Sequence, residues 1–164
     1  MTIAGRQRGW LHPDFHSRFR HELHRLALRH AIAVPVYCLM PDHMHVLSVG
    51  LNHTADQRLW IRAGRREINQ LLPPCRLQKQ AHDHVLRPDE QGRDAFATLV
   101  HYILNNPVRA ALVATANDWP YSGCILPAGP ELNVHDEIFM DAWWAYWNTS
   151  AVQATLSLRS KAAT

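Results

Sequence analysis

Apolar residues recur at helical spacing near the start of the chain and are followed by a nearly continuous apolar run. The helical spacing begins after Pro13, a residue suited to the first turn of a helix, and involves four positions: Phe15, Phe19, Leu23 and Leu26. The run from Val34 to Met40 then predicts a buried strand, and Pro41-Asp42 predicts a turn. From His43 to Val49 the pattern alternates, which predicts a second strand paired with the first.

The rest of the chain alternates between helical patterns and turn residues. A helix is predicted from about Asp56 to Leu72, and another from Ala95 to Asn106, where Pro107 ends it. Short strands are predicted over residues 2–8 and 84–87, and a last, tryptophan-rich helix over 136–147. This order favours a single α+β domain over residues 1–150, with helices covering one face of an antiparallel sheet. A tail of small residues over 151–164 follows, and the sequence leaves its order open.

Length and composition narrow the class of protein. The 164 residues fit one domain with a sizeable core, and no apolar run approaches the ~18 residues that cross a membrane, so no membrane partner is expected. Three widely spaced cysteines with no CxxC pair favour a reducing, cytoplasmic setting. Of the 17 basic residues only Lys79 and Lys161 are lysines. Because arginine suits bidentate contacts with phosphate, this composition favours a nucleic-acid partner.

The most informative motif is the pair His43 and His45. Alternate residues of a strand point to the same face, so these imidazoles have Cβ atoms roughly 7 Å apart and can bind one metal ion. They share that face with Leu47 and Val49, so we expect them to point inward, toward whatever covers the sheet. A second HxH over 82–84 is a weaker candidate, because the sequence offers no third ligand near it.

A tyrosine and an amide lie on one face of the predicted helix from Ala95 to Asn106. Tyr102 and Asn106 are four residues apart, which is about one helical turn. Imidazole and amide ligands together suit Mn²⁺ or Mg²⁺ without choosing between them. Such an ion polarises a phosphoryl oxygen, and a nearby cation favours the phenolate of Tyr102. Attack of that phenolate on a phosphodiester would give a covalent phosphotyrosine.

These motifs together resemble the REP-associated tyrosine transposases, which are single-tyrosine HUH nucleases related to the transposases of small insertion sequences. The resemblance covers roughly residues 10–125 and rests on three segments: CLMPDHMH (38–45), HYILNNPVR (101–109) and WPYS (119–122). The chain departs from the family in having fewer residues before Gly5, in Ala111 where glycine is common, and in Gly123 where a second serine is usual.

The resemblance implies a ferredoxin-like core of the HUH nuclease type, with the tyrosine helix packed across the strand of the two histidines. It also implies a metal site, with Mg²⁺ or Mn²⁺ held by His43, His45 and Asn106. Tyr102 would cut single-stranded DNA beside a hairpin and stay attached to the 5′ phosphate. The expected function is therefore that of a metal-dependent single-strand DNA endonuclease and strand transferase acting near REP-like hairpins.

Two alternatives remain open from the sequence. The chain could be a non-catalytic nucleic-acid-binding module of the same fold, or a metal-dependent phosphodiesterase that uses activated water. The second alternative needs no tyrosine, so replacing Tyr102 separates it from the transposase mechanism. The cleavage sequence, the metal used in the cell, and the choice between monomer and homodimer are not predicted.

Several further side chains are candidates for DNA contact. Arginines cluster on one side of the helix from Asp56 to Leu72, and two more lie near the motifs in sequence. The expected phosphate contacts are Arg58, Arg62, Arg65, Arg66, Arg87 and Arg109. Trp143, Trp144 and Trp147 could stack exposed bases, although core packing is the commoner role for such residues. Tyr37, Tyr121 and Tyr146 are interpreted as structural, because none has an amide partner in a helical frame.

Overall fold

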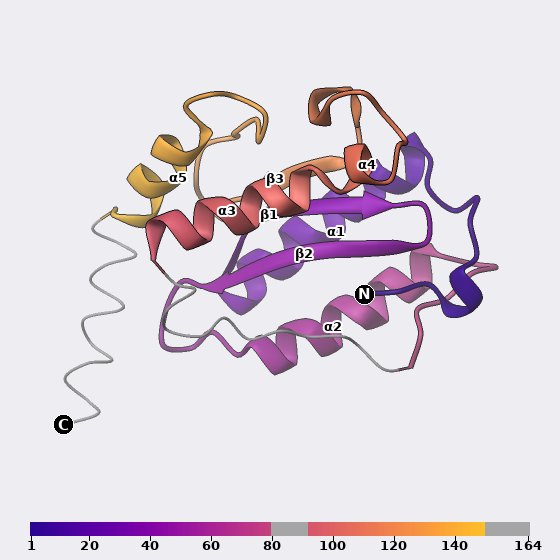
Figure 1. Cartoon of the computed structure of the whole chain (residues 1–164). Coiled ribbons are helices and arrows are strands. Elements are labelled where there is room, and N and C mark those ends of the chain that lie inside the picture. Colours follow the sequence, from indigo (N-terminus) through magenta and orange to yellow (C-terminus); the bar gives the residue numbers. More distant parts are fainter. Residues whose placement is uncertain (80–91, 150–164) are drawn as a thin grey trace.

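A three-stranded antiparallel sheet, in the order β2-β1-β3, forms the centre of the molecule (Figure 1). The computed structural model describes residues 1–79 and 92–149. β1 spans Ile32–Met40 and β2 spans His43–Gly50, so both strands predicted around the Pro41-Asp42 turn are confirmed. β3, Ser122–Ile125, pairs with the other edge of β1 and was not predicted. Its four residues are too short to show a period of their own.

Four longer helices of the described part of the chain pack around this sheet: α1 (Pro13–His30), α2 (Gln57–Leu71), α3 (Arg93–Leu104) and α5 (Phe139–Trp147). They cover both faces, so the expectation that helices cover one face is wrong. Every residue of β1 is buried. Tyr37 and Leu39 pack with residues of α1 and α2, whereas Val36 and Cys38 pack with residues of α3 and α5. A strand that is apolar on both faces has to be covered on both sides.

The helix boundaries follow local chemistry at most ends. α1 begins at Pro13, as predicted, and the His12 ring accepts a hydrogen bond from the amide of Phe15. α2 begins one residue later than predicted because the Asp56 carboxylate caps it, accepting from two backbone amides. α5 begins at Phe139 rather than at residue 136.

The end of the tyrosine-bearing helix differs from the prediction. α3 ends at Leu104, and Asn105 leaves helical geometry with φ −85° and ψ 1°. Asn106 then opens a separate short helix, α4 (Asn106–Arg109), with Pro107 in its first turn. Proline suits that position because its missing amide hydrogen would have no partner there. Pro107 therefore lies at the start of a helix and does not end the preceding one.

The N-terminal segment does not form the predicted strand over residues 2–8. Thr2 bridges His43 at the edge of β2, Ile3 bridges Leu77, and Ala4–Arg6 is a turn of 3-10 helix, η1.

The predicted strand over 84–87 and the tail over 151–164 lie outside the described residues. No helix within residues 1–79 and 92–149 is both long enough and apolar enough to span a membrane. A second 3-10 turn, η3 (Ala116–Asp118), precedes β3.

Candidate metal and nucleophile site

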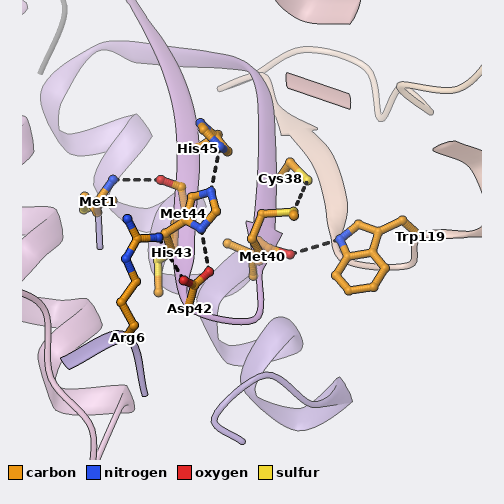
Figure 2. A network of polar contacts seen from close by, with 10 residues as sticks. Met1, Arg6, Cys38, Met40, Asp42, His43, Met44, His45 and Trp119 are labelled. Atoms are coloured by element: carbon orange, nitrogen blue, oxygen red, sulfur yellow. Dashed lines mark hydrogen bonds and ion pairs between the residues drawn. The ribbon is translucent and has the colours of Figure 1, made fainter. Parts of the chain in front are cut away.

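The two histidines lie at the start of β2, directly after the turn from β1. They are on the face of the sheet that α3 covers, since Leu47 in the same alternation packs with residues of α3. Their rings approach each other through Nε2, and the two Nε2 atoms are 2.9 Å apart (Figure 2). The prediction that both imidazoles point the same way agrees with this geometry.

This separation suits two ligands of one metal ion. Two nitrogen ligands at right angles around an ion, each about 2.1 Å from it, are about 3.0 Å apart. The observed 2.9 Å between His43 Nε2 and His45 Nε2 is close to this spacing. Within the described part of the chain there is no group of three or more His, Cys, Asp or Glu side chains that could hold a metal. Among residues 1–79 and 92–149, a further protein ligand would therefore be another type of group, such as the predicted amide.

Asp42 and Arg6 form a chain of polar contacts that ends on the His43 ring. One carboxylate oxygen of Asp42 lies 2.7 Å from His43 Nδ1, and the other accepts from Arg6 at 2.9 Å (Figure 2). Burial alone would raise the pKa of Asp42, but the hydrogen bonds from Arg6 and His43 outweigh it and lower that pKa. Asp42 therefore stays ionised and acts as an acceptor.

His45 is held in its neutral form. Burial lowers the pKa of its imidazole to about 4, and His43, the N-terminal ammonium group and Arg109 act in the same direction. A neutral imidazole is the form that binds a metal. His45 is therefore neutral at neutral pH, and its Nε2 can bind a metal once the ring proton is on Nδ1.

Tyr102 lies on α3, and 48% of its surface is exposed. It lines a cavity of about 550 Å³ that His45 also lines, so α3 and β2 both contribute to this cavity. The guanidinium of Arg109 lies 4.6 Å from the centre of the Tyr102 ring. The positive charge of Arg109 also contributes to the lowered pKa of His45. The Tyr102 hydroxyl has no hydrogen-bond partner among residues 1–79 and 92–149.

Asn106 turns its side chain back toward the helix that precedes it. Its Nδ2 donates to the carbonyl oxygens of Tyr102 at 2.9 Å and Ile103 at 3.2 Å. This orientation leaves the amide oxygen, the atom that a hard cation prefers, for other partners. Asn106 is half-buried and is not among the described residues that line the cavity. The structure thus places His45 and Tyr102 on one cavity, which neither His43 nor Asn106 lines, and the ligand roles of His43, His45 and Asn106 stay predictions.

The walls of this cavity are mostly apolar and aromatic. They come from β2, α2, α3 and α5, and include Trp60, Phe96, Trp144 and Trp147. Trp143 is buried and stacks on Phe96 with ring centres 5.5 Å apart, so its role is in the core. Trp144 is partly exposed, and the guanidinium of Arg93 lies 5.0 Å from its ring centre. An arginine therefore lies on an aromatic ring at each end of α3.

The four arginines predicted to contact DNA from α2 differ in whether they already have a partner within the described residues. Arg65 donates to the backbone carbonyls of Gln78 and Lys79, and Arg66 pairs with Glu67 at 2.7 Å. Arg58 and Arg62 are exposed and form no ion pair with other described residues. They are the better candidates for phosphate contacts. Arg87 lies outside the described residues.

The other tyrosines agree with a structural role. Tyr37 is fully buried, and the Tyr146 hydroxyl donates to the carbonyl of Pro127 at 3.1 Å. Burial raises the pKa of each to about 12, despite the hydrogen bond from Arg20 to Tyr37. Tyr121 is half-buried against the rings of His16 and Trp119. Among the described tyrosines, Tyr102 alone is classed as exposed.

No protein-family model matches the chain, and neither the curated proteins nor the solved structures that were searched contain a match.

Sequence reasoning missed two residues of this site. Asp42 is part of the CLMPD segment, and an acidic residue directly before a histidine ligand is a local signal that could have been used. Arg6 is 36 residues from Asp42, and nothing in the local sequence indicates their contact. Their contribution becomes visible only in the folded chain.

Proposed function

We propose that the protein is a metal-dependent single-strand DNA endonuclease and strand transferase of the HUH type. In this proposal Tyr102 is the nucleophile, and His43, His45 and Asn106 bind Mg²⁺ or Mn²⁺. The main support is geometric: the exposed Tyr102 lines the same cavity as His45, whose Nε2 lies 2.9 Å from that of His43. The sequence resemblance supplies the substrate class, which is single-stranded DNA next to a hairpin.

The proposed reaction exchanges one phosphodiester for another. The Tyr102 oxygen forms a bond to phosphorus while the bond from phosphorus to the 3′ oxygen breaks. The phenolic proton passes to solvent, which reaches the half-exposed side chain, and the departing 3′ oxygen takes up a proton. A bound divalent ion would polarise a phosphoryl oxygen and offset the charge that develops on it. Because the product keeps a phosphodiester bond, the strand can be rejoined or transferred without ATP.

Residues around Tyr102 would position it and the DNA. Arg109 lies on the face of the phenol ring and supplies positive charge beside the scissile phosphate. Arg58 and Arg62 of α2, which form no ion pair with the described residues, would contact the DNA backbone, so affinity should fall steeply as salt rises. The proposed location is the cytoplasm, where such DNA is present, and the active species is a monomer or a homodimer.

The test is formation of a covalent adduct. The purified protein should become covalently attached to a labelled, hairpin-bearing single-stranded oligonucleotide when Mn²⁺ or Mg²⁺ is present, and EDTA should prevent this. Tyr102→Phe should abolish the adduct. Tyr121→Phe is the matched control, since it removes a hydroxyl from a half-buried tyrosine that does not line the cavity, and it should retain activity.

Three results would contradict the proposal and separate the alternatives. An adduct that survives in Tyr102→Phe would place the nucleophile elsewhere. Metal-dependent hydrolysis of a phosphodiester that survives in Tyr102→Phe, with no adduct in either protein, would indicate a phosphodiesterase using water. Hairpin binding with no cleavage at any metal concentration would indicate a binding module.

A further inference from the structure

The N-terminal segment reaches the first histidine of β2 through a chain of charged groups. Arg6, in η1, donates to one oxygen of the Asp42 carboxylate at 2.9 Å, and the other oxygen lies 2.7 Å from His43 Nδ1 (Figure 2). The Asp42 side chain is only 16% exposed, whereas that of Arg6 is 65% exposed. Each carboxylate oxygen thus has its own partner, and the pair of contacts prevents the carboxylate from rotating.

We propose that Asp42, held by Arg6, is a positioning residue that fixes the His43 ring with its Nε2 directed at the cation site. This inference rests on the proposed metal site and does not depend on DNA cleavage. Carboxylate groups behind histidine ligands orient the ring and strengthen the ligand in many metal sites. Neither Arg6 nor Asp42 would touch the metal or the DNA.

The hydrogen bond assigns the proton on His43. An ionised carboxylate can only accept, so Nδ1 of His43 is the nitrogen that bears hydrogen. Nε2 of His43 then carries the lone pair, which accepts a hydrogen bond from His45 Nε2, 2.9 Å away, in the metal-free protein. A cation placed between the two rings would meet that lone pair. Without Asp42, the proton could move to Nε2 and the ring could rotate about its Cβ–Cγ bond, and either change would remove the ligand.

Backbone pairing explains how Arg6 reaches Asp42. Met44 and Met1 exchange backbone hydrogen bonds, each 2.7 Å long, and the amide of Ile3 donates to the carbonyl of Asp42 at 3.0 Å. The chain then turns through Gly5 and Arg6, both of which have positive φ. Such a backbone is disfavoured for arginine and persists here because the pairing on its N-terminal side holds it. The pairing of the N-terminal segment with β2 therefore holds Arg6 next to Asp42 at the end of the strand that carries the two histidines.

The first measurement is Mn²⁺ affinity, followed by titration calorimetry or by the loss of the free-ion electron paramagnetic resonance signal. Asp42→Ala should weaken binding about 10- to 100-fold. Asp42→Asn keeps an acceptor oxygen without the charge and should lose less, and Arg6→Ala should lose less than Asp42→Ala. Asp141→Asn, an exposed carboxylate on α5, is the control for losing one negative charge and should bind like wild type.

The second measurement needs no metal. Nitrogen-15 NMR of the metal-free protein should report His43 protonated on Nδ1 in wild type and a mixture of both tautomers in Asp42→Ala. A purely structural role for Asp42 would lower thermal stability and leave the tautomer unchanged. If Asp42→Ala does not fold, the Mn²⁺ affinity and the His43 tautomer can be measured in Asp42→Asn instead.

The outcomes separate this inference from the proposed function. Unchanged Mn²⁺ affinity in Asp42→Ala and Asp42→Asn, or a wild-type His43 protonated on Nε2, would overturn the role of Asp42. A wild-type protein with no affinity for Mn²⁺ would overturn the metal site and this inference with it. Weaker Mn²⁺ binding in Asp42→Ala, in a protein that never cleaves DNA, would support the inference and contradict the nuclease.

Discussion

Two clusters with the same residue types lie on opposite faces of the sheet. The first, which we call the closed cluster, consists of His16, Arg20 and Tyr37 on the face of α1. The second, the open cluster, consists of His43, His45, Tyr102 and Arg109 on the face of α3. Burial lowers the pKa of His16 to about 4, with a contribution from Arg20, and lowers that of His45 to the same value. Residue types, and the pKa values of His16 and His45, therefore do not distinguish the two clusters.

The difference between the clusters lies in how much hydrogen-bonding capacity is used. In the closed cluster the Tyr37 hydroxyl lies 2.9 Å from both His16 Nε2 and Arg20, and none of the tyrosine is exposed. In the open cluster the Tyr102 hydroxyl has no partner among the described residues and faces solvent. The Arg109 guanidinium lies on the ring instead of at the oxygen. The closed cluster is a completed part of the core, whereas the open cluster leaves a hydroxyl whose hydrogen-bonding capacity the described residues do not use.

A glycine shows how closely the first cluster is packed. A Cβ atom at Gly123 of β3 would lie 2.6 Å from the Tyr37 hydroxyl and 2.7 Å from Arg20. Real Cβ atoms essentially never approach so closely, and the obstacle is a buried, doubly hydrogen-bonded tyrosine that cannot move aside. This gives a physical reason for a glycine where members of the resembling family usually have serine.

The largest expected difference between the clusters is in metal-dependent activity. His45→Ala should reduce cleavage of a hairpin oligonucleotide at least about 100-fold, because it removes a proposed ligand, and should leave DNA binding mostly intact. His16→Ala, on the closed cluster, should keep the rate per folded molecule. Cleavage rates at saturating Mn²⁺ and binding by fluorescence anisotropy test both variants. Equal rate losses in the two would remove the functional distinction between the clusters.

The free energy of unfolding should change more for a substitution in the closed cluster than for one in the open cluster. Tyr37→Phe leaves Arg20 and His16 without their buried partner and should lower the free energy of unfolding by about 1–3 kcal/mol. Tyr102→Phe removes an exposed hydroxyl with no described partner and should change that free energy by less than about 0.5 kcal/mol. Urea unfolding of the metal-free proteins measures both. A Tyr102→Phe variant as unstable as Tyr37→Phe would mean that the Tyr102 hydroxyl has a structural role.

The smallest expected difference between the clusters is in the pH dependence of stability, to which both contribute in the same direction. Each histidine has its pKa lowered to about 4 in the folded protein, from the ordinary value of 6.5. As the pH falls, His16 and His45 therefore take up protons near pH 6.5 in the unfolded chain but only near pH 4 in the folded chain. The resulting stability is fully present above about pH 6.5 and is lost as the pH falls toward 4.

This pH effect can be assigned to each cluster by thermal melts between pH 4 and 7.5. His16→Gln should flatten the profile of the metal-free protein. Mn²⁺ should raise the melting temperature at neutral pH and progressively less toward pH 5, since protons compete with the metal for the imidazoles. His45→Ala should lose that Mn²⁺-dependent rise, whereas His16→Gln should keep it. A rise of equal size in both variants would place the metal away from β2.

The sequence by itself determined the elements whose patterns are local. Helical spacing predicted α1 from its first residue, the apolar run and the alternating run predicted β1 and β2, and strand alternation placed His43 and His45 on one face. Tyr102 on a helix, and the structural interpretation of Tyr37 and Tyr146, also followed from local pattern. These features depend on residues at most a few positions apart, so the order of side chains along the chain is enough to specify them.

Only the tertiary structure decided the features that join distant residues. These include β3 on the free edge of β1, helices on both faces of the sheet, and the contact of Arg6 with Asp42 across 36 residues. The break at Asn105, which directs the Asn106 amide back toward Tyr102, belongs with them. Each depends on which surfaces remain to be covered once the local elements have formed. That choice is made by packing and by pairing of buried polar groups, which no local pattern records.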